Sequence, residues 1–169
     1  MKIIKIYSDG SHLKRTTGRL GCGGVMVDVS GGGFGKILDS YSTELTQDKL
    51  RADCGSVDVS NPTAEMFGVL ESLRNFNIPD TADKIIFMAD YEGVSKWLPR
   101  DPKIKTWKIK ASYIQKLYDL IWELIEEKGI ADKVEFAWVK GHQSKQMSVL
   151  NPDAYYNDLC DSLAKGESI

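Results

Sequence analysis

The chain has 169 residues, of which 42% are hydrophobic and 27% charged, and its formal net charge is −2. This length suits one domain with a sizeable core, so we expect residues 1–169 to form a single domain. No apolar run approaches the roughly 20 residues that a membrane-spanning helix needs, and no signal-peptide pattern opens the chain. The three cysteines, Cys22, Cys54 and Cys160, lack the spacing of a zinc site or a disulfide framework. We therefore expect a monomer in the reducing cytoplasm, without membrane contact.

The first part of the chain predicts an antiparallel meander. Alternating and β-branched residues predict three strands, over residues 2–8, 21–29 and 36–45. Short links between them favour antiparallel pairing. Residues 46–60 are polar and lack periodicity, so we interpret them as a loop.

The second part predicts helices that alternate with strands. Asn61 suits the N-cap and Pro62 the first turn of a helix that runs to Leu73. Strands are predicted over 84–89 and 134–139, helices over 91–98, 112–128 and 152–166, and a loop over 141–150. The helix between the first strand and residues 84–89 favours a parallel crossover. Together these elements predict an α/β fold.

Four carboxylates occupy informative places in this pattern. Asp9 and Asp90 each close an apolar stretch that predicts a strand, and Glu65 and Asp161 each lie early in a predicted helix. A sheet with flanking helices could bring all four together. Carboxylates in one cluster repel one another and raise each other's pKa. Divalent cations neutralise this repulsion. The pattern therefore indicates a metal site.

Basic residues gather in one segment although the whole chain is slightly acidic. Residues 96–116 hold seven lysines and arginines against one acid, so this window carries about +6 and the rest of the chain about −8. Trp97 and Trp107 lie inside or at the edge of the lysine-rich stretch. A basic surface beside an acidic metal pocket suits a polyanionic substrate.

The order of the elements and the acidic motifs resemble the ribonuclease H family, over nearly the whole chain. The matching motifs are Tyr7-Ser8-Asp9-Gly10-Ser11, Thr63-Ala64-Glu65, Ala89-Asp90, Val139-Lys140-Gly141-His142 and Asn157-x-x-x-Asp161-x-Leu163-Ala164. The segment with Trp97 and Trp107 is placed like the basic protrusion of cellular type 1 enzymes. The chain departs from the family at Tyr91, where a small hydroxyl side chain is frequent.

The resemblance implies a ribonuclease-H-like fold with a mixed five-stranded sheet in the order 3-2-1-4-5 and helices on both faces. It implies endonucleolytic hydrolysis of the RNA strand of RNA–DNA hybrids with two Mg²⁺ ions, and Mn²⁺ as a possible substitute. Asp9 would bridge both ions, Glu65 and Asp90 would lie on the leaving-group side, and Asp161 would hold the ion that activates water. His142 would relay protons or ease product release. Substrate contacts would come from Gly10, Ser11, Asn61, Trp97, Lys103, Lys105, Trp107, Lys108, Lys110 and Asn157.

Each of these residues also has a plainer interpretation. Asp9 precedes a glycine, as in many turns, and Glu65 lies in the first turn of a helix, where the macrodipole favours an acid. Asp161 could be a solvated helix residue, and a lone loop histidine such as His142 is more often structural than catalytic. Asn61 could simply cap its helix. The basic segment could be an ordinary solvated surface, although its tryptophans favour nucleic-acid binding.

Two rival functions follow from the same residues. The fold also hosts exonucleases, integrases and junction resolvases that act on DNA. A catalytically inactive nucleic-acid-binding domain is the second rival, but such domains usually lose a carboxylate, and all four remain here.

Overall fold

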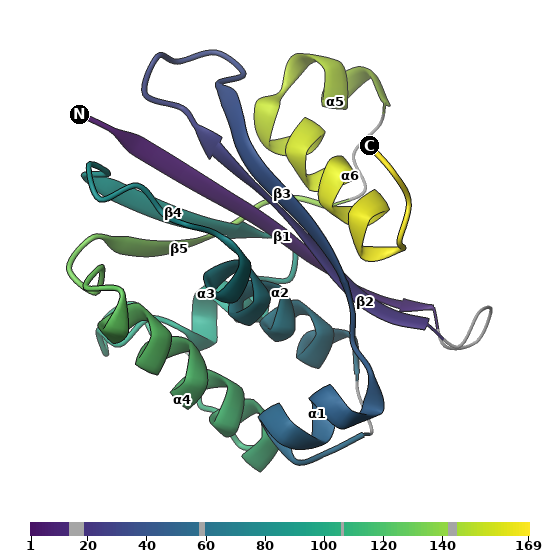
Figure 1. Cartoon of the computed structure of the whole chain (residues 1–169). Helices are drawn as coiled ribbons and strands as arrows, with labels where there is room; N and C mark the ends of the chain where they lie inside the picture. Colours follow the sequence, from purple (N-terminus) through teal and green to yellow (C-terminus); the bar gives the residue numbers. More distant parts are fainter. Residues whose placement is uncertain (14–18, 58–59, 106, 142–144) are drawn as a thin grey trace.

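The computed structural model describes residues 1–13, 19–57, 60–105, 107–141 and 145–169. The described residues form a five-stranded sheet in the order β3-β2-β1-β4-β5 (Figure 1). Its strands are β1 (Ile3–Leu13), β2 (Arg19–Asp28), β3 (Lys36–Glu44), β4 (Lys84–Ala89) and β5 (Val134–Trp138). β1 pairs antiparallel with β2 and parallel with β4, β2 pairs antiparallel with β3, and β4 pairs parallel with β5. The predicted sheet order and mixed pairing are confirmed.

Helices cover both faces of this sheet, as predicted (Figure 1). One face carries α1 (Gln47–Cys54), α2 (Asn61–Asn75), α3 (Glu92–Trp97) and α4 (Ser112–Glu127), and the other carries α5 (Lys145–Leu150) and α6 (Pro152–Ala164). Alternate residues of β1 serve the two faces: Ile4 and Ile6 join the core with α2 and α4, while Tyr7 packs with α6. No helix in the described ranges is both long and apolar enough to cross a bilayer.

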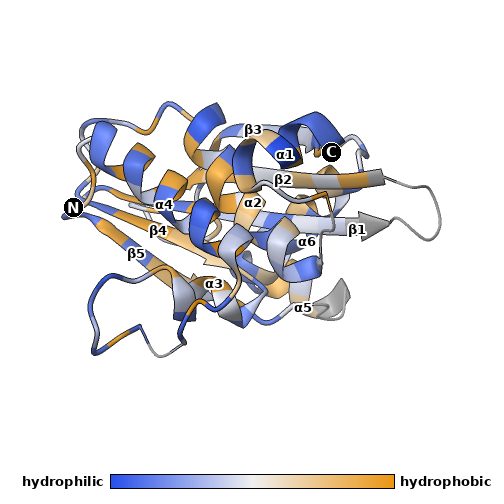
Figure 2. Cartoon of the chain, turned by 90° about the horizontal axis from the view of Figure 1, so that it is seen from below, coloured by the Kyte–Doolittle hydropathy of each residue, from blue (hydrophilic) through white to orange (hydrophobic). Residues whose placement is uncertain are grey.

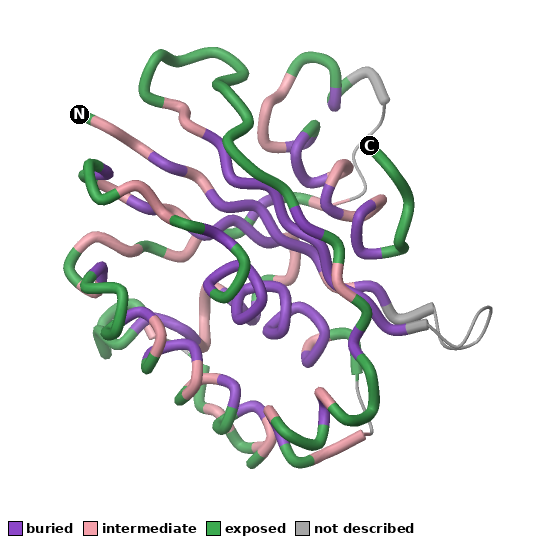
Figure 3. The backbone as a smooth tube through the Cα atoms, viewed as in Figure 1, coloured by how far each residue is buried: buried purple, intermediate pink, exposed green. Residues whose placement is uncertain are grey.

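α2 is the central helix of the larger layer, and almost all of its surface is buried (Figure 3). Figure 2 shows hydrophobic residues concentrated on α2, β4 and β5, whereas α1 is mainly hydrophilic. α4 buries one stripe, formed by Ile114, Leu117, Ile121, Trp122 and Ile125. Burial of these faces provides the main stabilisation of the layer.

Two glycines let helices approach the strands that carry the acidic motifs. A Cβ added at Gly10 in β1 would lie 2.3 Å from the carbonyl carbon of Ala64 in α2. A Cβ added at Gly23 in β2, which is the register partner of Asp9, would lie 2.4 Å from Cβ of Leu163 in α6. α2 and α6 therefore contact the sheet on either side of Asp9 at distances that only glycine permits.

Two predicted loops and the predicted end of the first strand were wrong. Residues 46–60, interpreted as a loop, contain α1: Thr46 Oγ1 accepts a hydrogen bond from the Lys49 N–H at 3.2 Å, and Gly55 ends the helix with a φ of 73°. Only Leu50 and Cys54 of α1 are buried, which is too few to produce a visible periodicity.

The predicted loop 141–150 contains the short helix α5. A hydrogen bond between Ser148 Oγ and Asp158 connects it to α6.

β1 continues to Leu13 instead of ending at Ser8, so Asp9 lies inside a strand. The N-cap of α2 is Ser60, and Asn61 is the first helical residue. Asn151 is the N-cap of α6, since its side chain accepts a hydrogen bond from the Asp153 N–H at 3.0 Å.

Candidate active site

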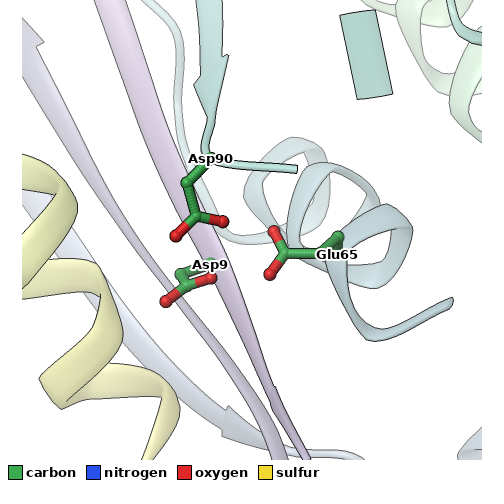
Figure 4. A group of neighbouring side chains, drawn as sticks. All are labelled: Asp9, Glu65 and Asp90. Atoms are coloured by element: carbon green, nitrogen blue, oxygen red, sulfur yellow. The ribbon is translucent and has the colours of Figure 1, made fainter. Parts of the chain in front are cut away.

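Three carboxylates from separate elements meet at one end of the parallel strand pair. Asp9 comes from β1, Glu65 from α2, and Asp90 directly follows β4. One carboxylate oxygen of each lies within 4.8 Å of the others. Figure 4 shows the three side chains pointing toward one another.

The local structure explains why these residues meet. Ser8 pairs with Ala89 in the parallel β1–β4 ladder, so Asp9 within β1 and Asp90 directly after β4 lie at the same level of neighbouring chain segments. Glu65 projects from the start of α2. This helix can lie close to β1 because Gly10 has no side chain. The Gly10 N–H donates to Asp9 Oδ1 at 3.0 Å and to Glu65 Oε1 at 3.3 Å. One backbone amide therefore holds two of the acids in register.

The acids are buried and repel one another. Burial raises the pKa of Asp9 to about 8; the Asp90 and Asp161 carboxylates also raise it, whereas its hydrogen bond with Glu65 opposes the shift. Burial, and next the nearby Asp9, raise the pKa of Glu65 well above its ordinary value. Glu65 Oε2 is buried without a hydrogen-bond partner in the described part of the chain. A buried, unpartnered carboxylate oxygen facing two further carboxylates is the environment that a hard divalent cation neutralises.

Asp161 lies at the same pocket but is arranged differently. It lines the pocket with the three acids, yet it is not part of the group whose oxygens all lie within 4.8 Å among the described residues. Its Oδ2 forms a salt bridge with Lys165 Nζ at 2.8 Å, one helical turn later in the chain, and its side chain is 32% exposed. Asp161 thus borders the group from the α6 side.

The pocket around the carboxylates has a volume of about 520 Å³. Of the predicted substrate contacts, Gly10, Ser11 and Asn61 line it. Asn157, on α6, is buried and donates from Nδ2 to Asp90 Oδ2 at 3.4 Å. It therefore contacts an acid of the group.

Four further residues line the pocket that the sequence did not single out as site residues: Tyr91, Trp138, Lys140 and Gly141. A Cβ added at Gly141 would lie 2.8 Å from Asp90 Oδ2, so the backbone there packs directly on the carboxylate. The Val139-Lys140-Gly141-His142 motif contains or adjoins three of them, Trp138, Lys140 and Gly141. Their place in or next to this motif could have identified them as site residues. Tyr91 was visible only as the neighbour of Asp90.

The predicted basic segment follows α3 and has mixed exposure. Lys103, Lys108 and Lys110 are exposed, whereas Lys105 is half-buried with its Nζ 4.1 Å from the centre of the Tyr118 ring. Trp97 packs against Trp107 with ring centroids 5.9 Å apart.

The indole of Trp97 also packs against the pocket residue Tyr91, at 5.7 Å. Aromatic contacts thus connect the segment with the pocket. His142, the fifth predicted catalytic residue, lies outside the described residues.

An acidic pocket on a sheet of order 3-2-1-4-5 defines a ribonuclease-H-like protein, and comparison with known proteins agrees. The family model described as RNase H matches residues 1–169, so the chain belongs to the ribonuclease H family. It is 28% identical to ribonuclease HI of Haemophilus ducreyi over 98% of this chain and 90% of that protein. It is 29% identical to ribonuclease HI of Haemophilus influenzae over 97% of this chain and 88% of that protein.

Solved structures share the fold at lower identity. LC11-RNase H1, solved in complex with an RNA/DNA hybrid, superposes with a TM-score of 0.64 at 16% identity, covering 97% of this chain and 95% of that one. The prototype foamy virus protease-reverse transcriptase superposes with a TM-score of 0.65 at 18% identity, covering 98% of this chain and 21% of that one.

Proposed function

We propose that this protein is a divalent-metal-dependent endonuclease that hydrolyses the RNA strand of RNA–DNA hybrids, leaving 5′-phosphate and 3′-hydroxyl ends. The observation that carries the proposal is the group formed by Asp9, Glu65 and Asp90, in which Glu65 Oε2 is buried and has no hydrogen-bond partner among the described residues. Membership of the ribonuclease H family supports the choice of substrate. So do the exposed lysines of the basic segment, which suit a phosphate backbone.

The donor set fits hard cations. All the candidate ligands are carboxylates, which Mg²⁺ and Mn²⁺ accept readily. Asp9, Glu65 and Asp90 would hold one Mg²⁺, and Asp161 would complete a second site together with Asp9. When bound, such a pair activates water and neutralises the departing 3′ oxygen.

The remaining residues position these acids and the substrate. Asn157 orients Asp90 through the 3.4 Å contact, and the Gly10 amide holds Asp9 and Glu65. Ser11 and the exposed Asn61 border the pocket where a minor-groove 2′-hydroxyl would lie, which is the feature that separates RNA from DNA. Trp97, Trp107, Lys103, Lys105, Lys108 and Lys110 would contact the hybrid backbone. His142, which lies outside the described residues, would relay protons or ease product release.

We also propose that residues 1–169 act as one domain, as a monomer in the cytoplasm. Both core clusters pack on the same central sheet, which supports one domain. Cys22, Cys54 and Cys160 are buried free thiols, which suits a reducing compartment. Size-exclusion chromatography with light scattering tests the monomer, and a dimer mass would contradict it.

A labelled RNA–DNA hybrid, single-stranded RNA and duplex DNA, each incubated with Mg²⁺, Mn²⁺ or EDTA, test the activity. We expect metal-dependent cleavage of the hybrid's RNA strand alone. Asp9→Asn should abolish cleavage but keep hybrid binding, whereas the matched control Asp28→Asn, at the partly exposed end of β2, should cut normally. Cleavage of duplex DNA would favour the DNA-nuclease rival, and hybrid binding without any cleavage by the wild type would favour the inactive binding domain.

A further inference from the structure

Trp138 presents its indole to solvent beside the carboxylates. It is the last residue of β5, pairs in register with Ala89, lines the acidic pocket, and is 54% exposed. Its indole N–H donates to the main-chain carbonyl of Asp90 at 3.0 Å. The ring is therefore fixed at the pocket while much of its surface stays uncovered.

A second tryptophan makes the same kind of hydrogen bond but is buried. Trp122 also donates from its indole N–H to a main-chain carbonyl, that of Leu98 at 2.8 Å, yet it is only 7% exposed. Both indole N–H groups have a hydrogen-bond acceptor, but Trp122 buries nearly all of its surface whereas Trp138 leaves about half of its surface in solvent. Exposure of a fixed indole next to a candidate catalytic site indicates a binding surface.

Tyr91 provides a second fixed ring that lines the pocket. A Cβ added at Gly93 would lie 2.2 Å from Cε1 of Tyr91, so the ring lies directly on the backbone of α3. Trp97 packs on it at 5.7 Å, and Tyr91 lines the pocket with Trp138.

We propose that Trp138 and Tyr91 form an aromatic wall that packs against a sugar ring of the nucleic-acid strand held at the carboxylates. In a duplex the bases are stacked inside the helix, so a side chain beside the scissile backbone meets furanose rings and phosphates. The apolar ring of Trp138 suits the C–H face of a sugar, and such a contact is independent of base sequence. This inference rests on the proposed function and adds two substrate-contact residues to it.

Hybrid binding, measured in Asp9→Asn variants that cannot cleave the hybrid, tests the role of Trp138 and Tyr91. We expect Trp138→Ala to weaken binding about tenfold and Tyr91→Ser several-fold, whereas Trp138→Phe and Tyr91→Phe, which keep a ring, should stay within about threefold. With Asp9 intact, Trp138→Ala should raise KM and leave kcat within about twofold. The control Phe34→Ala removes another exposed aromatic that does not line the pocket, and it should change neither value.

Salt dependence separates this contact from a charge effect. The tenfold loss in Trp138→Ala should be equal at low and high salt, whereas Lys108→Ala should lower the slope of log K against log salt by about one. Unchanged binding in Trp138→Ala, or in Trp138→Leu should the alanine variant not fold, would overturn the proposal. So would a loss of kcat with unchanged KM, which would indicate a structural role. Because binding is measured without cleavage, these results stand even if the wild type fails to cut hybrids.

Discussion

The side-chain amide of Asn157 donates to Asp90 Oδ2 at 3.4 Å and thereby links α6 to the end of β4. Asn157 is 4% exposed and lies one helical turn before Asp161. The contact therefore fixes the position of α6, and with it Asp161, relative to the acids that emerge from the sheet.

Removing this amide should impair catalysis more than folding. A hydrogen bond to a charged group is worth about 1.5–3 kcal/mol, so Asn157→Ala should lower kcat/KM for hybrid cleavage about tenfold or more. Asn75→Ala is the matched control, because Asn75 Nδ2 donates to Glu71 Oε2 at 3.2 Å far from the pocket. It should alter thermal stability only. Equal activity losses in both variants would show that the Asn157 contact has no special role.

Substitution by glutamine at two buried glutamates of α2 should change the free energy of unfolding in opposite directions. Glu65 faces other acids and has an unpartnered oxygen, so Glu65→Gln should raise the metal-free free energy of unfolding, on the order of 1 kcal/mol, while abolishing cleavage. Glu71 is ion-paired with Lys49 at 2.7 Å and Arg74 at 3.0 Å. Glu71→Gln should therefore lower the free energy of unfolding by about 1–2 kcal/mol.

Urea unfolding in EDTA measures both free energies, and a hybrid assay in Mg²⁺ measures activity. We expect Glu71→Gln to cut hybrids at nearly the wild-type rate, because its contacts join α1 to α2 and do not reach the pocket. If Glu65→Gln destabilised the metal-free protein as much as Glu71→Gln does, the acids would not be in mutual repulsion.

The sequence predicted the sheet because its signals were local and strong. Long apolar strands and the periodic stripe of α4 identify their elements directly, and the acidic motifs identified the residues that meet where the pairing of β1 with β4 ends. α1 was missed because its stability comes from Leu50 and Cys54 packing on a core assembled from distant segments. Tyr91 and Trp138 were missed as site residues for a similar reason, since their exposure and orientation depend on how α3 and β5 pack.

The metal-free protein should lose stability as pH rises. The pKa of Asp9 is raised to about 8 in the folded chain from an ordinary value of 3.8, so between these values the folded state binds more protons than the unfolded state. The free energy of unfolding then falls with increasing pH across that window. In EDTA, Tm should fall more steeply from about pH 5 to about pH 8 in the wild type than in Asp9→Asn. Added Mg²⁺ should flatten the wild-type profile, because a bound cation replaces the proton, and parallel profiles in EDTA would contradict the coupling.

A single methyl group added at Gly10 should move Glu65 away from Asp9. The added Cβ would lie 2.3 Å from the carbonyl carbon and 2.5 Å from the carbonyl oxygen of Ala64, so α2 must move away from β1 and carry Glu65 from Asp9. We expect Gly10→Ala to lower stability by about 1–3 kcal/mol and to reduce both Mg²⁺ affinity and hybrid cleavage. Gly31→Ala is the matched control, since a Cβ there meets nothing within 4 Å. Calorimetric Mg²⁺ titration and thermal unfolding of both variants measure these effects, and a Gly10→Ala variant with wild-type Mg²⁺ affinity would show that close contact between α2 and β1 does not assemble the site.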